Sequence, residues 1–179
     1  MVSAPEFARP ERIDSIGERA RRITIGATAQ ERAALAERFG LLSIAALDAD
    51  FTIRREAAGI AASGSVRAQV VQACVVTGDP VPAAIEERVA LRFVPADQAP
   101  AEDEVEIEGE ALDTVHYSGG AIDLGEAAAE TVALALDPFP RAPHAAEALR
   151  AAGVLSEEEA AAARSPFAAL QGKIGTVRP

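Results

Sequence analysis

Residues 122–143 read IDLGEAAAETVALALDPFPRAP, and this segment contains the signals that begin, continue and end one helix. Asp123 is a good N-cap because its carboxylate can accept hydrogen bonds from free N–H groups of the first turn, and Glu126 can complete a capping box. Pro138 and Pro140 end the helix. Between these signals lies an apolar stripe at helical spacing: Leu124, Ala128, Val132 and Ala135, widened by Leu134 and Leu136. We therefore expect a core helix with this stripe, Leu134 included, packed inside.

Glu126 and Glu130 lie one turn apart on the same side of this helix. Like charges at this spacing destabilise an isolated helix by roughly 0.2 to 0.5 kcal/mol. The sequence therefore predicts that a cation from another part of the chain offsets the repulsion.

Residues 41–95 show the alternation of apolar and polar side chains that is typical of strands. The clearest runs are residues 51–55, 60–72 and 85–94. Turn-forming residues at 57–59 and 77–80 separate them, so neighbouring strands should pair as antiparallel hairpins. Thr114–Tyr117 can add one more short strand. One face of the sheet should meet water, because its charged and amide side chains cannot all be buried.

The N-terminal region predicts a second helix. Thr28 as N-cap and Glu31 as its capping-box partner begin it, and Gly40 ends it. The expected apolar face consists of Ala33, Leu35, Ala36 and Phe39. Two extended segments precede this helix, at residues 6–13 and 21–25.

The C-terminal region is rich in alanine and predicts short helices at residues 144–152 and 156–163. A chain of 179 residues can bury one sizeable core. We therefore expect a single α+β domain over residues 1–171 and a flexible tail at 172–179. Its architecture should be an antiparallel sheet of about five or six strands from residues 41 to 117. Two helices should pack on that sheet, followed by an Ala-rich helical C-terminal tail.

The net charge of −11 argues against a broad phosphate-binding face, because cations dominate affinity for nucleic acid. The best basic cluster consists of Arg19, Arg21 and Arg22, but acidic residues lie among them. Any direct RNA contact should therefore be limited and local, with these arginines as the candidates.

Residues 102–113 contain seven acids and no base. Three interpretations remain open for this acidic segment: a solvated loop, a charged edge strand protected from aggregation, or a mimic of nucleic-acid charge that binds a basic protein. The role of the segment is left undecided by the sequence.

The chain offers few residues for metal or nucleophilic chemistry. Its soft ligands are Cys74, His116 and His144, and their spacing fits no zinc pattern. There is no nucleophile elbow and no glycine-rich nucleotide-binding loop. We therefore expect no enzyme activity, cofactor, metal or small-molecule substrate, and interpret Cys74 as a buried structural thiol. The chain has no signal-peptide pattern and no run of transmembrane length, so we expect a cytoplasmic protein.

Several segments together resemble the YceD family, bacterial large ribosomal RNA subunit accumulation proteins. The helix segment supplies an acidic-Leu-Gly motif with a later Glu and a Pro-x-Pro exit, at Asp123, Leu124, Glu130 and Pro140. Cys74 within Gln72–Thr77, the Phe93–Pro95 segment, and Pro166 and Phe167 within Ser165–Leu170 follow the family in order and spacing. Many family members carry a second cysteine where this chain has Thr77, which puts any metal or redox role in doubt.

This resemblance implies a non-enzymatic role in the accumulation of 23S ribosomal RNA and in biogenesis of the 50S subunit. The implied partner is a large-subunit precursor or a basic ribosomal protein. A rival hypothesis is an acidic protein-binding adaptor unrelated to ribosomes, and a third is an unrecognised enzyme. The residues themselves do not decide between these functions.

Overall fold

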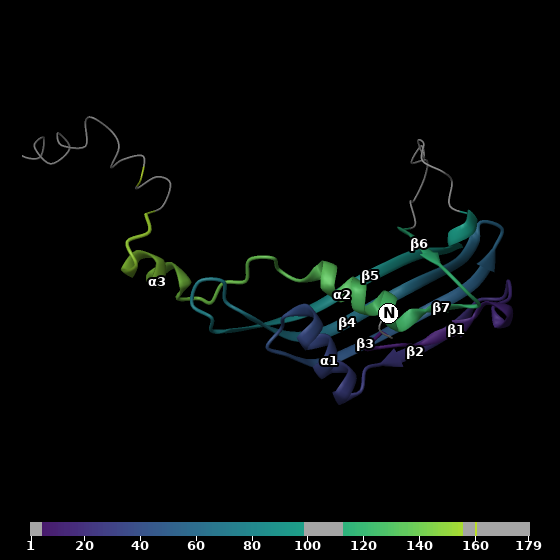
Figure 1. Ribbon diagram of the computed structural model, residues 1–179, viewed down its shortest axis with the longest axis horizontal. Helices are drawn as coiled ribbons and strands as arrows, with labels where there is room; N and C mark the ends of the chain where they lie inside the picture. Colours follow the sequence, from purple (N-terminus) through teal and green to yellow (C-terminus); the bar gives the residue numbers. More distant parts are fainter. Residues whose placement is uncertain (1–4, 99–112, 156–159, 161–179) are drawn as a thin grey trace, which may run out of the picture.

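Three long antiparallel strands form the centre of the computed structural model, which describes residues 5–98, 113–155 and 160 (Figure 1). The elements are β1 (Pro10–Arg12), η1 (Ile13–Ser15), β2 (Arg21–Gly26), α1 (Ala29–Phe39), β3 (Ser43–Glu56), β4 (Gly59–Ala73), β5 (Pro80–Pro95), η2 (Ala96–Gln98), β6 (Asp113–Tyr117), β7 (Ala121–Asp123), α2 (Leu124–Ala135) and α3 (Ala145–Ala151). The predicted α+β class is confirmed.

The main sheet has five strands in the order β2-β3-β4-β5-β6. The first four are antiparallel, as predicted, but β6 is parallel to β5, with Leu91 opposite Asp113 and Pro95 opposite Tyr117. Residues 96–112 separate these strands, which is long enough to return the chain for parallel pairing. The sheet also begins at β2, earlier in the chain than residue 41. The expectation of a wholly antiparallel sheet confined to residues 41–117 is therefore wrong in these two respects.

Helix α1 begins and ends as its sequence predicts. Thr28 and Glu31 form a full capping box, and Gly40 adopts a left-handed conformation with φ of 65° at the C-cap. Leu35 and Ala36 are buried against the sheet, whereas Ala33 is exposed. Ala33 therefore does not belong to the apolar face.

Helix α2 buries a narrower stripe than the sequence predicts. Leu124, Ala128 and Val132 are fully buried, but the side chain of Leu134 is 88% exposed. Each residue advances roughly 100° around a helix, so Leu134 lies roughly 200° from Val132 and faces away from the sheet. The assignment of Leu134 to the core is wrong.

The Asp123 carboxylate caps α2, as expected, but Glu126 does not complete a capping box with it. The Glu126 carboxylate instead accepts hydrogen bonds from both terminal nitrogens of Arg38 on α1, at 3.0 and 2.6 Å. Arg38 is therefore the cation that the repulsion between Glu126 and Glu130 predicts.

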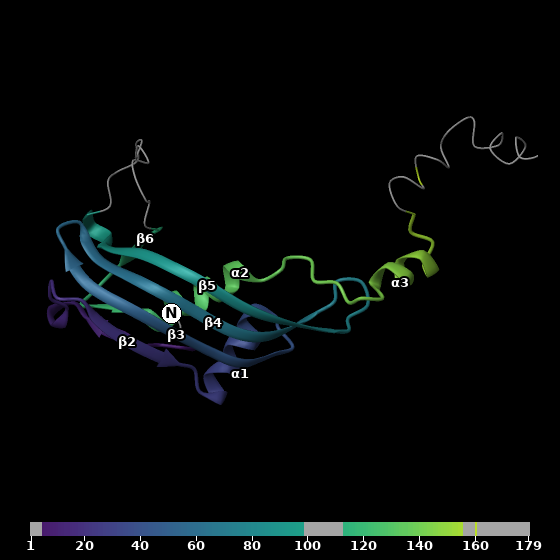
Figure 2. The ribbon, with the colours of Figure 1, turned by 180° about the vertical axis from the view of Figure 1, so that it is seen from behind.

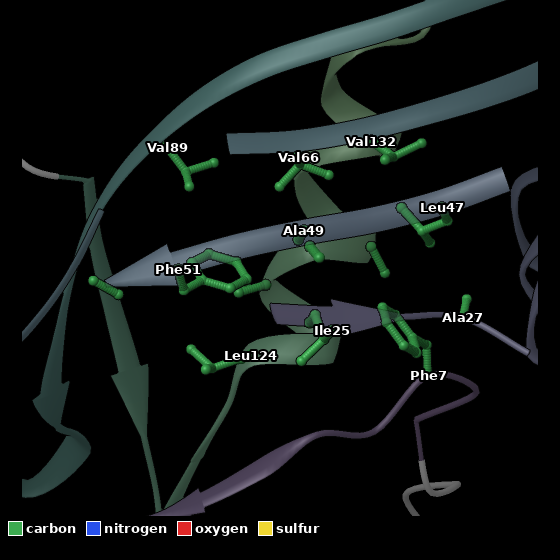
Figure 3. Close-up of a cluster of buried hydrophobic side chains, with 14 of the residues drawn as sticks. Phe7, Ile25, Ala27, Leu47, Ala49, Phe51, Val66, Val89, Leu124 and Val132 are labelled. Carbon is green, nitrogen blue, oxygen red and sulfur yellow. The ribbon is translucent and has the colours of Figure 1, made fainter. Parts of the chain in front are cut away.

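The N-terminal segment lies against the start of α2. Strand β1 pairs with β7 in a two-stranded antiparallel sheet, and the fully buried Phe7 enters the core with Leu124 (Figure 3). Gly125 allows this approach, because a Cβ there would lie 2.0 Å from the carbonyl oxygen of Phe7. The glycine of the acidic-Leu-Gly motif is therefore required by packing.

Helices α1 and α2 both pack on one face of the main sheet (Figure 1). The core lies between them and the sheet and contains Phe51, Val66 and Val89 from the three long strands (Figure 3). No described element covers the opposite face (Figure 2). That face carries the polar residues of the alternating pattern, which confirms the expected wet face.

The predicted helix at residues 144–152 is present as α3, which lies beyond one end of the sheet (Figure 1). Several other predictions fall mainly or wholly outside the described residues: the helix at 156–163, the tail at 172–179, the acidic segment at 102–113, and the motif residues Pro166 and Phe167. They stay predictions, as does the single domain over residues 1–171.

Candidate functional site

Asp123 joins two distant parts of the chain. Its Oδ1 atom accepts hydrogen bonds from the backbone N–H groups of Gly125, Glu126 and Arg9, at 2.9, 3.1 and 2.8 Å. The neighbouring Leu124 is fully buried. These two motif positions therefore hold the start of α2 against the N-terminal segment and serve the fold.

Cys74 is buried at the end of β4, with a side chain that is 3% exposed. Its sulfur accepts a hydrogen bond from the Ala142 N–H at 3.2 Å. This donor and the Thr77 hydroxyl favour the thiolate and lower the pKa of Cys74 to about 6. The thiol fixes the chain between α2 and α3 onto the sheet, which supports its interpretation as a structural residue.

A neighbouring hydrogen bond holds the same segment, residues 136–144 between α2 and α3, beside Cys74. The Val75 N–H donates to the carbonyl oxygen of Pro140 at 2.9 Å, and Pro140 is buried. Outside this contact, His144 Nε2 lies 2.9 Å from the carboxylate of Asp79. Hydrogen bonds lower the pKa of Asp79, the larger effect coming from Thr77 and the smaller from His144.

Residues 5–98, 113–155 and 160 contain no group of three His, Cys, Asp or Glu side chains arranged to hold a metal.

The three predicted RNA-contact arginines do not form one cluster. Arg21 pairs with Glu11 at 2.5 Å, while Arg22 lies 3.4 Å from the carboxylate of Asp50. Arg21 and Arg22 project to opposite faces because side chains alternate along β2. Arg19 is exposed in the loop before that strand. Two of the three charges are thus already paired within the fold.

A groove of about 480 Å³ lies between α2 and the β5–β6 side of the sheet. We call it the α2–β5 groove. Its apolar lining includes Val89 and Leu91 from the sheet and Leu134 from α2, and its charged lining includes Glu87 and Glu130. The motif position Glu130 is exposed here, in contrast to the buried motif positions Cys74 and Leu124.

The family model of the large ribosomal RNA subunit accumulation protein YceD matches residues 62–172, more than half of the chain. The chain belongs to the YceD family. No curated protein and no solved structure matches it.

The YceD match begins within β4 and includes β5, β6, β7, α2 and α3. The matched range contains Cys74, the segment between α2 and α3 that Cys74 contacts, and the residues that line the α2–β5 groove. Strands β1 to β3 and helix α1 lie outside it, although Asp123 ties the N-terminal segment to the matched part. In the part of the chain that the structure describes, no helix is long and apolar enough to cross a membrane.

The α2–β5 groove was not predicted from the sequence of this YceD-family chain. A first signal for the groove was Glu130, which follows the family motif but lies outside the apolar stripe of α2. The assignment of Leu134 to the core concealed the second signal, an exposed leucine on the same side of the helix.

Proposed function

We propose that this chain is a non-enzymatic, cytoplasmic factor that supports accumulation of 23S ribosomal RNA and biogenesis of the 50S subunit. The observation that carries the proposal is its membership of a family described by large ribosomal RNA subunit accumulation. The buried Cys74 sulfur accepts a hydrogen bond from the Ala142 N–H, which supports a structural role for this residue.

We further propose that the factor acts mainly through protein contacts, with a large-subunit precursor or a basic ribosomal protein as partner. The net charge of −11 supports this choice, because ribosomal RNA is an anion and a basic protein is not. Seven arginines form ion pairs with carboxylates within the described residues. Those pairs reduce the positive charge available to phosphates, so a direct RNA footprint should be small.

The test is to measure binding of the purified full chain to naked 23S RNA and to purified 50S precursor particles between 50 and 200 mM salt. A protein that neutralises about six or more phosphates loses roughly a thousandfold or more in affinity over that range. We expect binding to the particles with a much smaller salt dependence, and weak binding to naked RNA. Tight, steeply salt-dependent binding to naked RNA that is lost in the triple variant Arg19→Ala, Arg21→Ala, Arg22→Ala would contradict protein contact as the main mode.

The acidic net charge also favours a second candidate, an adaptor that binds a basic protein unrelated to ribosomes. Sedimentation of a cell lysate through a sucrose gradient distinguishes the two. A large-subunit factor should sediment in part with 50S precursors, and its removal should lower the amount of 23S RNA relative to 16S RNA. An adaptor should remain at the top of the gradient and leave that ratio unchanged.

A further inference from the structure

Strand β5 extends beyond Asp113–Tyr117, the part of its outer neighbour β6 that the structure describes. Strand β6 pairs with residues 91–95 of β5, whereas β4 pairs with residues 80–93. Within the described residues, no strand pairs with the outer edge of β5 between Pro80 and Ala90. Alternate residues of a strand direct their backbone groups to opposite neighbours, so this edge presents N–H and C=O groups without a strand partner among the described residues.

The usable part of this edge is Ala83–Ala90, because Pro80 and Pro82 have no backbone N–H to donate. At about 3.3 Å per residue, eight residues extend over roughly 26 Å. That length is sufficient for one ordinary strand to be added beside β5.

This edge of β5 borders the α2–β5 groove. Val89 and Leu91 form the sheet side of the groove, and Leu134 lies across from them on α2 with 88% of its side chain exposed. A strand added to β5 would direct every second side chain towards this apolar surface. Backbone pairing and an apolar pocket for alternate side chains are together the features of peptide recognition by strand addition.

The charges around the groove identify the chemistry of the partner. Glu87 on β5, Glu130 on α2 and Asp113 at the start of β6 contribute three carboxylates, against the single arginine Arg88. All three carboxylate residues are exposed. The groove therefore favours a segment that carries both apolar and basic side chains.

We propose that the α2–β5 groove binds an extended basic segment of a large-subunit ribosomal protein, which pairs as an added strand with Ala83–Ala90. This inference rests on the proposed function for the identity of the partner. Leu134 and Val89 contact the apolar side chains of the segment, and Glu87 and Glu130 contact its basic side chains.

The first test uses the full-length chain and purified 50S precursor particles. The double variant Leu134→Ser, Glu130→Lys should raise the Kd for the particles at least about tenfold. The matched control is Leu42→Ser, Glu37→Lys, since Leu42 is another exposed leucine and Glu37 is an exposed glutamate on α1 that does not line the groove. The control should bind within about twofold of wild type, and both variants should keep the wild-type circular dichroism spectrum.

The outcomes of this test are distinct. Loss of binding in the groove variant alone supports the inference. Equal binding by wild type and the groove variant would show that the groove is not the binding site, but it would not contradict the proposed function. Absence of wild-type binding to any particle would overturn the proposed function and, with it, the partner.

Two further measurements examine the occupant. A photoreactive residue introduced as Leu134→p-benzoylphenylalanine should crosslink to a large-subunit protein in the purified particles, while the same change at Leu42 should not. Crosslinking of position 134 mainly to 23S RNA would overturn the choice of a protein partner. Hydrogen exchange of peptides within residues 83–90 should slow at least about tenfold on particle binding. Unchanged exchange on binding, or full protection already in the free chain, would overturn strand addition.

Discussion

The guanidinium group of Arg38 lies between two carboxylates, those of Glu126 at 2.6 Å and Glu6 at 2.9 Å. Arg38 is on α1, Glu126 is on α2, and Glu6 is in the N-terminal segment. One side chain therefore connects three parts of the chain that are not neighbours in sequence, and it places a positive charge beside the acidic pair on α2.

Replacing Arg38 should destabilise the fold moderately. In Arg38→Ala the repulsion between Glu126 and Glu130 has no compensating cation, and we expect the free energy of unfolding to fall by about 1 kcal/mol. Partial exposure keeps the effect small, since the Arg38 side chain is 35% exposed. Urea denaturation measures the change. The control is Arg54→Ala, which removes an exposed pair with the sequence neighbour Glu56 and should have less effect.

The exposed position of Leu134 leads to a clear contrast on α2. Leu134→Asp should change the free energy of unfolding by no more than about 0.5 kcal/mol, because the new carboxylate meets water. Val132→Asp places an unpaired charge in the core and should cost several kcal/mol, about 3 or more. Urea melts of both variants test the orientation of the helix. Equal destabilisation by the two substitutions would contradict the observed stripe.

Glu31 should make stability depend on pH. Hydrogen bonds from Arg9, and from the backbone N–H of Thr28, lower the pKa of Glu31 to about 2. A carboxyl with a lowered folded-state pKa stabilises the fold above its unfolded pKa of 4.5, and the contribution is lost as the pH falls towards 2. With the Glu31 side chain 21% exposed, solvent screening leaves an expected contribution of about 1 to 2 kcal/mol.

The measurement compares wild type with Glu31→Gln by urea denaturation at several pH values. The advantage of wild type should be full at pH 7 and should shrink as the pH is lowered from 4.5 towards 2. The comparison cancels the other titrating groups to first order. A difference that stays constant with pH would mean that Glu31 keeps an ordinary pKa.

Cys74 should be replaceable by serine more easily than by valine. Cys74→Val keeps an apolar side chain but removes the acceptor for the buried Ala142 N–H, which should cost about 1 to 3 kcal/mol. Cys74→Ser retains an acceptor and should cost less. Amide exchange at Ala142 reports the loss directly, because its protection should fall in the valine variant. Equal protection in wild type and Cys74→Val would show that the Cys74 sulfur is not the acceptor that protects the Ala142 N–H from exchange.

Local signals predicted local structure well. Thr28, Glu31 and Gly40 determine the ends of α1 through contacts within a few residues of themselves, so the pattern alone was sufficient. The direction of β6 depends instead on the long connection after β5, and no pattern within Asp113–Tyr117 contains that information. The position of Leu134 shows the same limit, because an apolar residue at the end of a helix is assigned correctly only when its angle around the helix is considered.

The candidate site was harder to predict than the fold. The motif residue Cys74 was correctly expected to be buried, yet its partner Ala142 is a backbone group that no side-chain motif identifies. The α2–β5 groove lies beside a part of β5 that no described strand pairs with on its outer side, although β4 pairs with residues 80–93. Periodicity marks where strands occur but does not show how far neighbours overlap.

The bond from Arg9 to Asp123 also has a consequence for synthesis, because its two residues are 114 positions apart. During translation the N-terminal strand must wait for Ala121–Asp123 before it has a partner. At about 5 to 20 residues added per second, the wait lasts roughly 6 to 23 s. Throughout that time Phe7 lacks its neighbours at the start of α2. The nascent chain therefore carries β1 without its strand partner beside the translating ribosome until nearly the whole sheet has been made.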